Sequence, residues 1–293
     1  MSQLSRRDFL EYGRAGVAGA VAVALGTRVA AYPLDGVMGL QSFDVRQALA
    51  ADLDGTLKTL AGFGYKALDL VISNGSGEPT AARYRQALDG AGMTCHNAHF
   101  NATAFDDANW AGSLAIAREL GLKEMVLAGG APGGRGAATP PSVDSWKTYA
   151  DSLNRAGAKT KAEGLQLGWH NHGEFRPIEN GGGLNPFDVL LEHTDPATVK
   201  FQIDVGNMAQ AGGDPIMYLT KYPTRYYSMH AKDIGADGRI GIAVGEGKQD
   251  FKRIFALAKA ANIHNYDVET GARADVVMEK LRMSADFLKA FTL

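Results

Sequence analysis

Eight short apolar segments, each followed by a stretch with helical periodicity, dominate this sequence from residue 37 onward. Strand-like runs that alternate with amphipathic helices indicate a parallel sheet in which each strand returns through a helix. Eight such units in about 260 residues match the usual size of a closed (β/α)8 barrel. The expected strands cover residues 37–43, 65–72, 93–100, 124–128, 165–172, 199–205, 226–230 and 265–269.

The segments between these strands show the spacing of helices with one apolar face. Leu49, Leu53, Leu57 and Leu60 lie three or four residues apart, as in such a helix. An open, doubly wound sheet is the competing architecture, because alternation alone does not prove closure. No GxGxxG follows the first strand, which argues against the dinucleotide-binding form of that sheet. We therefore predict an α/β chain with one barrel domain over residues 32–293.

The first 31 residues predict an export signal. Arg6 and Arg7 precede an uncharged run of 11 residues at 15–25, and small residues follow at 29–31. The run is too short for a membrane span, which needs about 20 apolar residues, and it lacks the polar face of an ordinary amphipathic helix. The paired arginines resemble the twin-arginine export class. We predict export to the periplasm by the twin-arginine machinery, with no stable membrane insertion once the signal is removed.

Charge and cysteine content argue against several classes of protein. Lys and Arg number 30 against 32 Asp and Glu, so the chain lacks the basic surplus expected of a nucleic-acid binder. The single cysteine, Cys95, excludes an internal disulfide and any multi-cysteine zinc or iron–sulfur site.

Histidines and carboxylates occur at the ends of the predicted strands. In a (β/α)8 barrel these ends meet at one mouth, so Asp204, His230 and Glu269 would form an arc across strands six to eight. Such an O/N/O set suits one divalent ion: Mn²⁺, Zn²⁺, Co²⁺ or Mg²⁺. The alternative is that Lys or Arg pairs with the carboxylates and His230 is a hydrogen-bonded core residue. Five of the seven histidines lie in or just after strands: His96, His99, His170, His172 and His230.

These residues carry a family resemblance. DVGN at 204–207, HAKD at 230–233, VGEG at 244–247 and VE at 268–269 resemble motifs of the sugar phosphate isomerase/epimerase group. GLQ at 39–41 and HNHGEF at 170–175 are similar to one branch of that group. The group belongs to the xylose isomerase-like TIM barrel superfamily. The motifs in this order are specific for the superfamily and not for a substrate.

The resemblance implies one divalent metal held by residues from strands five to eight. Asp204, His230 and Glu269 fall on the family's ligand positions. Strand five departs from the pattern, because His170 stands where many epimerases of the superfamily carry a glutamate. We predict that Glu174, four residues further on, supplies the fourth ligand, with direct ligation by one of the two strand-five histidines as the alternative.

The chemistry implied is proton transfer next to a sugar carbonyl. A divalent ion that binds the carbonyl and a neighbouring hydroxyl acidifies the C–H between them and stabilises the enediolate. Glu269 would serve one face of that species, and His170 or His172 the other. Lys232 would neutralise a developing oxyanion. The predicted substrate-binding residues are Gln41, His99 and Trp169.

We therefore expect a metal-dependent isomerase or epimerase that acts on a non-phosphorylated sugar or keto sugar, since an exported enzyme would rarely meet cytoplasmic sugar phosphates. A lyase or hydratase of 3-keto sugars or glycosides is the first alternative, because the two faces of the site carry different groups. A non-catalytic exported carbohydrate-binding barrel is the second. The expected partner is a small carbohydrate, and the sequence leaves the oligomeric state open.

Overall fold

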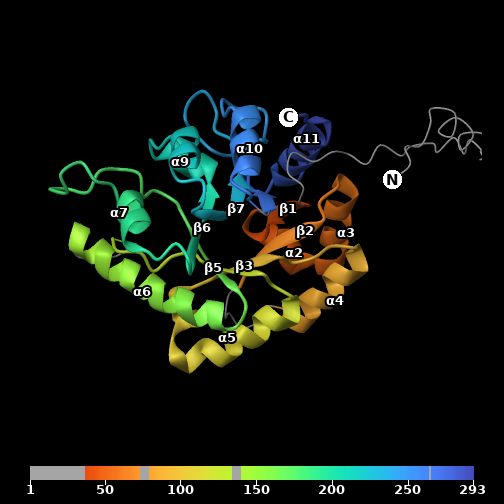
Figure 1. Ribbon diagram of the computed structural model, residues 1–293. Helices are drawn as coiled ribbons and strands as arrows, with labels where there is room; N and C mark the ends of the chain where they lie inside the picture. Colours follow the sequence, from red (N-terminus) through yellow and green to blue (C-terminus); the bar gives the residue numbers. More distant parts are fainter. Residues whose placement is uncertain (1–36, 73–78, 134–139, 264) are drawn as a thin grey trace, which may run out of the picture. The chain divides into compact units, whose positions relative to one another are not determined.

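The computed structural model describes residues 37–72, 79–133, 140–263 and 265–293, which form a closed barrel of eight parallel strands (Figure 1). The strands pair in sequence order, and the last pairs with the first. The prediction of a closed (β/α)8 barrel is confirmed, and the open sheet is excluded. The strands are β1 (Met38–Gln41), β2 (Ala67–Val71), β3 (Asn97–Phe100), β4 (Glu124–Leu127), β5 (Gln166–His170), β6 (Val199–Asp204), β7 (Tyr226–Ala231) and β8 (Asn265–Val268).

Helices follow the strands and lie around the barrel (Figure 1). The longer ones are α3 (Leu53–Phe63), α4 (Ala81–Ala91), α5 (Asp107–Leu120), α6 (Val143–Ala162), α7 (Pro186–His193), α10 (Phe251–Ala260) and α11 (Val277–Ala290). The shorter ones are η1 (Ser42–Val45), α2 (Arg46–Ala51), η2 (Ala102–Phe105), α8 (Val205–Gln210) and α9 (Pro215–Lys221).

The helical stripe that begins at Leu49 is interrupted where the sequence pattern predicts a continuous helix. Asp52 adopts an extended conformation (φ −153°, ψ 93°) between α2 and α3. Its carboxylate accepts the N–H of Gly55 at 2.9 Å and so caps the start of α3. A short polar side chain that binds the backbone in this way favours a new helix start over continuation.

The two faces of the barrel strands differ in chemistry. Outward side chains such as Leu68, Met125 and Ile203 are apolar and buried beneath the helices. The inward side chains are joined by hydrogen bonds across the barrel, from Asn97 to Asp267 (3.1 Å) and from Ser228 to Glu124 (2.6 Å). Side chains alternate between the faces of a strand, so the apolar core lies outside the sheet and the barrel interior is polar.

Two inward glycines make room for the buried carboxylates. A Cβ atom at Gly39 would lie 1.8 Å from Oδ1 of Asp267, and one at Gly168 would lie 2.3 Å from Oε1 of Glu124. Either contact is far inside the van der Waals limit, so a side chain at these positions would displace a carboxylate. The polar interior therefore depends on glycine in β1 and β5.

The predicted signal peptide at residues 1–31 lies outside the described residues. It stays a prediction, as does export through the twin-arginine machinery. Within the ranges that the structure describes, no helix is both long and apolar enough to cross a membrane.

Two glycine-to-alanine changes in outer helices should have opposite effects on stability. A Cβ at Gly157 of α6 would lie 2.8 Å from the carbonyl oxygen of Thr198 and 2.9 Å from Cγ2 of Val199, whereas one at Gly112 of α5 meets nothing within 4 Å. Gly157→Ala should lower the free energy of unfolding by about 1–3 kcal/mol through overpacking. Gly112→Ala should raise it by up to about 1 kcal/mol, because alanine favours helix. Urea unfolding measures both, and changes of the same sign would contradict this packing.

Candidate active site

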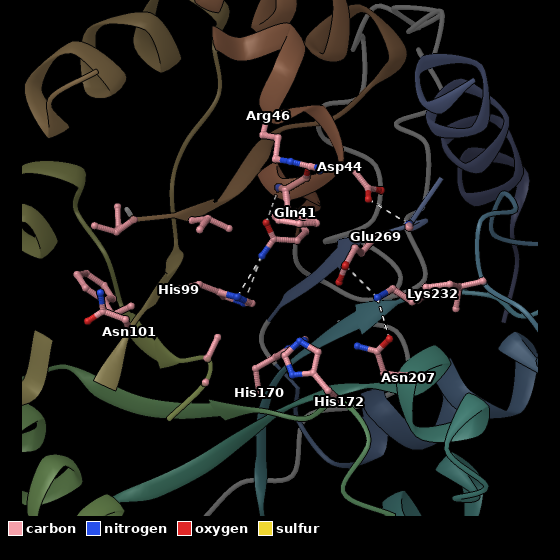
Figure 2. Close-up of a pocket in the computed structure, with 18 of the residues that line it drawn as sticks. Gln41, Asp44, Arg46, His99, Asn101, His170, His172, Asn207, Lys232 and Glu269 are labelled. Carbon is pink, nitrogen blue, oxygen red and sulfur yellow. Dashed lines mark hydrogen bonds and ion pairs between the residues drawn. The ribbon is translucent and has the colours of Figure 1, made fainter. Parts of the chain in front are cut away.

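A pocket of about 680 Å³ opens at the carboxyl ends of the strands (Figure 2). All four residues predicted to be catalytic line it, together with two of the three predicted to bind substrate. They come from five different strands or the turns that follow them, and the barrel brings them together as its topology requires. These lining residues are Gln41, His99, His170, His172, Lys232 and Glu269.

Four side chains beneath this pocket form a candidate metal centre. His170, Asp204, His230 and Glu269 each offer one ligand atom, and these atoms all lie within 4.8 Å of one another. Nδ1 of His230 is 2.8 Å from Oε2 of Glu269 and 3.8 Å from Oδ2 of Asp204. The arc across β6, β7 and the end of β8 is therefore present, and His170 at the end of β5 completes it.

The carboxylate of Asp204 is oriented by the N-terminus of helix α8. It ends β6 and caps α8, and its Oδ1 accepts the N–H of Asn207 at 2.7 Å. Oδ2 is buried and accepts no hydrogen bond of normal geometry, although Nζ of Lys232 forms an ion pair with it at 2.9 Å. One oxygen is thus held by the backbone, and the other faces the cluster.

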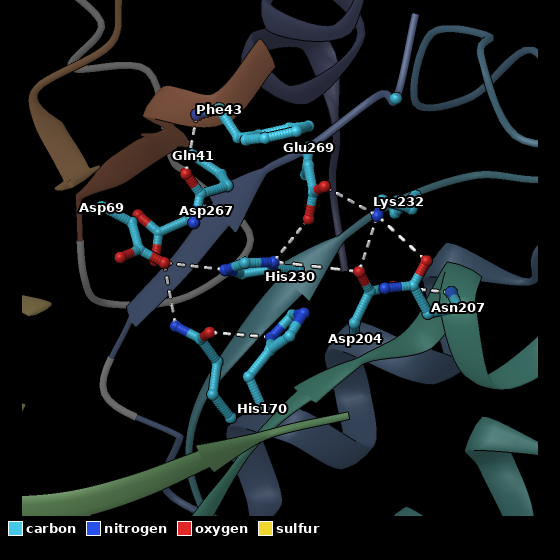
Figure 3. Close-up of polar contacts among 12 residues, drawn as sticks. Gln41, Phe43, Asp69, His170, Asp204, Asn207, His230, Lys232, Asp267 and Glu269 are labelled. Atoms are coloured by element: carbon cyan, nitrogen blue, oxygen red, sulfur yellow. Dashed lines mark hydrogen bonds and ion pairs between the residues drawn. The ribbon is translucent and has the colours of Figure 1, made fainter. Parts of the chain in front are cut away.

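Lys232 lies between the two carboxylates of the cluster (Figure 3). Its Nζ is 2.9 Å from Oδ2 of Asp204, 2.9 Å from Oε1 of Glu269 and 3.0 Å from Oδ1 of Asn207. Burial alone would lower the pKa of Lys232, but the two carboxylates raise it above its ordinary value. Lysine does pair with these carboxylates, as the alternative interpretation of the sequence expected, and the ammonium group keeps its charge.

The charges of this cluster fit a divalent cation. Asp69, Asp204 and Glu269 are buried carboxylates in contact with His230 or Lys232, and Lys232 contributes one positive charge. With both histidines neutral, as metal ligands must be, the sum is two negative charges, which one divalent ion would balance. Two carboxylates and two imidazoles are also a donor set that Mn²⁺, Co²⁺ or Zn²⁺ accepts. The residues present therefore fit one divalent ion.

Protonation of the two ligand histidines differs. Burial and the neighbouring His230 lower the pKa of His170 well below its ordinary value, so its ring is neutral. Burial would also lower the pKa of His230, but the carboxylates of Asp204, Asp69 and Glu269 raise it well above that value. His230 is thus a cation in the metal-free protein and would release a proton when Nδ1 binds metal.

Two sequence predictions about strand five are not met by the structure. Glu174 does not join the donor cluster, because its Oε2 turns back and accepts the N–H of His172 at 2.5 Å. His170 stands in the fourth position instead. Trp169 is buried on the outer face of β5, packs on Phe187 and Phe201, and does not line the pocket.

The sequence analysis did not identify two residues of this centre, and one of the five histidines near strands lies outside it. Asp69 of β2 and Gln202 of β6 are fully buried and hydrogen-bonded to the site histidines. An acid inside the apolar strand ALDLV and a polar residue two positions before Asp204 were the available signals. His96 precedes β3, contacts Thr94 at 3.0 Å and does not line the pocket.

Comparisons with known proteins agree with the barrel fold. Residues 57–290 match the family model described as the xylose isomerase-like TIM barrel. A crystal structure of a sugar phosphate isomerase/epimerase from Parabacteroides distasonis is 26% identical, with a TM-score of 0.73 over 87% of this chain and 97% of that one. A structure of the IolI protein with a bound zinc atom shares the fold at 11% identity and a TM-score of 0.63, covering 88% of this chain and 100% of that one.

Curated relatives in this comparison carry the name inosose dehydratase. The Clostridium tetani protein is 29% identical over 143 residues, which is 42% of this chain and 46% of the relative. The Clostridium beijerinckii protein is 33% identical over 97 residues, which is 32% of this chain and 30% of the relative. The chain therefore spans less than half the length of these relatives.

Glu124 should make stability depend on pH. Burial raises its pKa to about 8, so the folded protein keeps this proton, whereas the unfolded chain releases it near 4.5. Between these values the native state binds more protons, and the free energy of unfolding falls as pH rises. Relative to Glu124→Gln, the wild type should lose up to about 1.4 kcal/mol per pH unit across that window. Urea unfolding at several pH values measures this, and parallel pH profiles for the two proteins would contradict it.

Proposed function

We propose that this chain, which belongs to the xylose isomerase-like TIM barrel family, is a divalent-metal-dependent isomerase or epimerase of a non-phosphorylated sugar or keto sugar. The observation that carries the proposal is the cluster of two carboxylates and two imidazoles beneath a pocket at the barrel mouth. The name of the 26% identical Parabacteroides distasonis structure supports the same reaction class.

His170, Asp204, His230 and Glu269 would hold the ion. When bound, a divalent ion supplies Lewis acidity that weakens the C–H bond next to a coordinated carbonyl. Because Glu174 is turned away, the metal set would contain two histidines and two carboxylates.

Two unlike groups would move the proton. Burial would raise the pKa of Glu269, but Lys232 and His230 hold it below its ordinary value, so its carboxylate is ionised, as a proton acceptor must be, and the same two cations weaken its basicity. His172 is exposed at the pocket, and its ring centroid lies 4.7 Å from that of His170. With His170 occupied as a ligand, His172 is the strand-five imidazole that remains for the other face of the substrate.

Lys232 would act as a fixed charge. Its raised pKa keeps it protonated, which excludes a role as general base. Because Asp204, Glu269 and Asn207 already contact its ammonium group, Lys232 would stabilise a developing oxyanion through its charge. Gln41 and His99 line the opposite wall, where the Gln41 amide lies 3.3 Å from the His99 ring. These two would orient the sugar hydroxyl groups.

A lyase or hydratase of 3-keto sugars or glycosides is the second candidate. A carboxylate on one side and an imidazole on the other suit removal of a carbon-bound proton and protonation of a leaving hydroxyl. The relatives named inosose dehydratase favour this class. Both candidates share the metal and the proton acceptor Glu269, and they differ in the fate of the second proton.

The proposed cellular location limits the range of substrates for both candidate functions. Export to the periplasm by the twin-arginine route remains part of the proposal, on the paired Arg6 and Arg7. A periplasmic enzyme would meet free sugars or glycosides in preference to sugar phosphates.

The purified protein should bind about one divalent ion per chain. Asp204→Ala combined with Glu269→Ala should abolish that binding and the turnover, because both anionic ligands are lost. Glu246→Ala removes a carboxylate that pairs with Lys280 on the surface, and it should leave the metal content unchanged. Metal analysis measures the stoichiometry. A catalytically silent carbohydrate-binding barrel would instead bind sugar equally well with and without metal.

Reaction in D₂O should separate the two enzymatic candidates. An isomerase should place deuterium at the carbon next to the carbonyl and change no other mass, because the proton is removed and returned. A lyase or hydratase should lose or gain the mass of one water. Mass spectrometry of free and keto sugars after incubation reads both, and label without any water change would exclude the second candidate.

A further inference from the structure

An amide and a carboxylate lie behind the pocket, where neither touches bulk solvent. Gln202 of β6 and Asp69 of β2 are both 0% exposed and approach each other inside the barrel. Nε2 of Gln202 donates to Oδ2 of Asp69 at 3.0 Å. Oε1 of the same amide lies 2.9 Å from Nδ1 of His170 and 2.7 Å from Nε2 of His99. One amide therefore joins a carboxylate to two histidine rings.

The carboxylate decides which way this amide faces. An ionised carboxylate only accepts hydrogen bonds, so the NH₂ group of Gln202 must point at Asp69. Oδ2 of Asp69 lies within 3.2 Å of three nitrogens, those of Gln202, His230 and His99, so this oxygen is the acceptor in the network. The amide oxygen then faces both rings, and each ring must donate a hydrogen to it. His170 carries its hydrogen on Nδ1, and His99 carries its hydrogen on Nε2.

A second contact of His99 agrees with this assignment. Its Nε2 lies 3.2 Å from Oδ2 of Asp69, which is an acceptor, so the hydrogen on Nε2 faces two acceptor oxygens. Oε1 of Gln41 accepts the N–H of Phe43 at 2.8 Å, so the NH₂ group of Gln41 faces the histidine. That NH₂ nitrogen lies 3.3 Å from both Nδ1 and Nε2 of His99, so this contact does not select a ring nitrogen.

Asp69 also orients the third ring. Nε2 of His230 donates to Oδ2 of Asp69 at 2.8 Å, which leaves Nδ1 toward Glu269 (Figure 3). With Nδ1 of His170 bound to Gln202, its Nε2 is the nitrogen without a hydrogen.

We propose that Asp69 and Gln202 are positioning residues that select, through one hydrogen-bond network, the ring nitrogens that His170 and His230 present to the metal. The assignment for His170 and His99 stands on the network alone, and the part about metal rests on the proposed function. A glutamine suits this position because Asp69 already has Asp267 beside it, and a further carboxylate would add a buried negative charge.

Histidine tautomers in the metal-free protein test the network directly. With ¹⁵N-labelled histidine, NMR of the wild type should show hydrogen on Nδ1 of His170 and on Nε2 of His99. Gln202→Met keeps the length of the side chain but offers neither hydrogen-bonding group, so His170 should lose its single tautomer. Metal affinity measured by competition with a chelator should fall by about 10- to 100-fold, as for other partners of metal-bound histidines.

Ser228→Ala is the matched control. It removes a buried cross-barrel hydrogen bond, to Glu124 at 2.6 Å, without touching a histidine. It should leave the tautomers and the metal affinity unchanged. Should Gln202→Met fail to fold, Asp69→Asn keeps the shape at the other end, and its amide no longer fixes the direction of Gln202, so two tautomers of His170 are expected.

The opposite tautomer of His170 in the wild type would overturn the inference, as would Gln202→Met with wild-type tautomers and affinity. An equal loss of the single His170 tautomer and of metal affinity in Ser228→Ala would also overturn the inference, because the loss would then come from a general disturbance of packing. If the tautomers are as assigned but no divalent ion binds, the proposed function fails and the network stands. The two failures are therefore distinguishable.

Discussion

Balance of buried charge at the barrel mouth is the constraint on which the rest of this structure depends. Asp204 and Glu269 are drawn together by the convergence of parallel strands, and both contact the ammonium group of Lys232. Carboxylates this close and this buried repel unless positive charge lies between them. Lys232 supplies one charge, and a protonated His230 supplies a second in the metal-free protein. A divalent ion would replace that proton and complete the balance, which is why metal binding and the state of His230 are linked.

The interior of this barrel is polar, whereas the interior of a (β/α)8 barrel is usually filled by apolar side chains. Apolar side chains on the outer face of the strands pack under the helices and carry the hydrophobic stabilisation. The inner face is then free to hold Asp69, Asn97 and Glu124 in hydrogen-bonded positions beneath the site. Glycine at positions 39 and 168 leaves the space those carboxyl groups need. Hydrogen-bonded polar side chains inside the barrel therefore support the site, and they orient its histidines.

Much of this arrangement could be predicted from the sequence, because strand–helix alternation and strand-end residues are local patterns. The eight strands and the arc of Asp204, His230 and Glu269 follow from them. The prediction that Trp169 binds substrate was wrong, although the sequence could have corrected it. Side chains alternate between the two faces of a strand, so if His170 faces the barrel interior, Trp169 faces outward. The orientation of the Glu174 side chain could not be predicted, because it depends on a hydrogen bond to the backbone of a loop, which residue spacing in the sequence does not reveal. Asp69 and Gln202 were missed because they act across the barrel, between strands far apart in sequence.

Anomalous X-ray diffraction from crystals grown with Mn²⁺ tests the central claim most directly. We expect one strong peak bounded by Nε2 of His170, Oδ2 of Asp204, Nδ1 of His230 and the carboxylate of Glu269, with Nε2 of His230 still bonded to Asp69. A barrel with no anomalous peak at these atoms under saturating Mn²⁺, and with the ammonium group of Lys232 as the nearest cation to both carboxylates, would contradict the account.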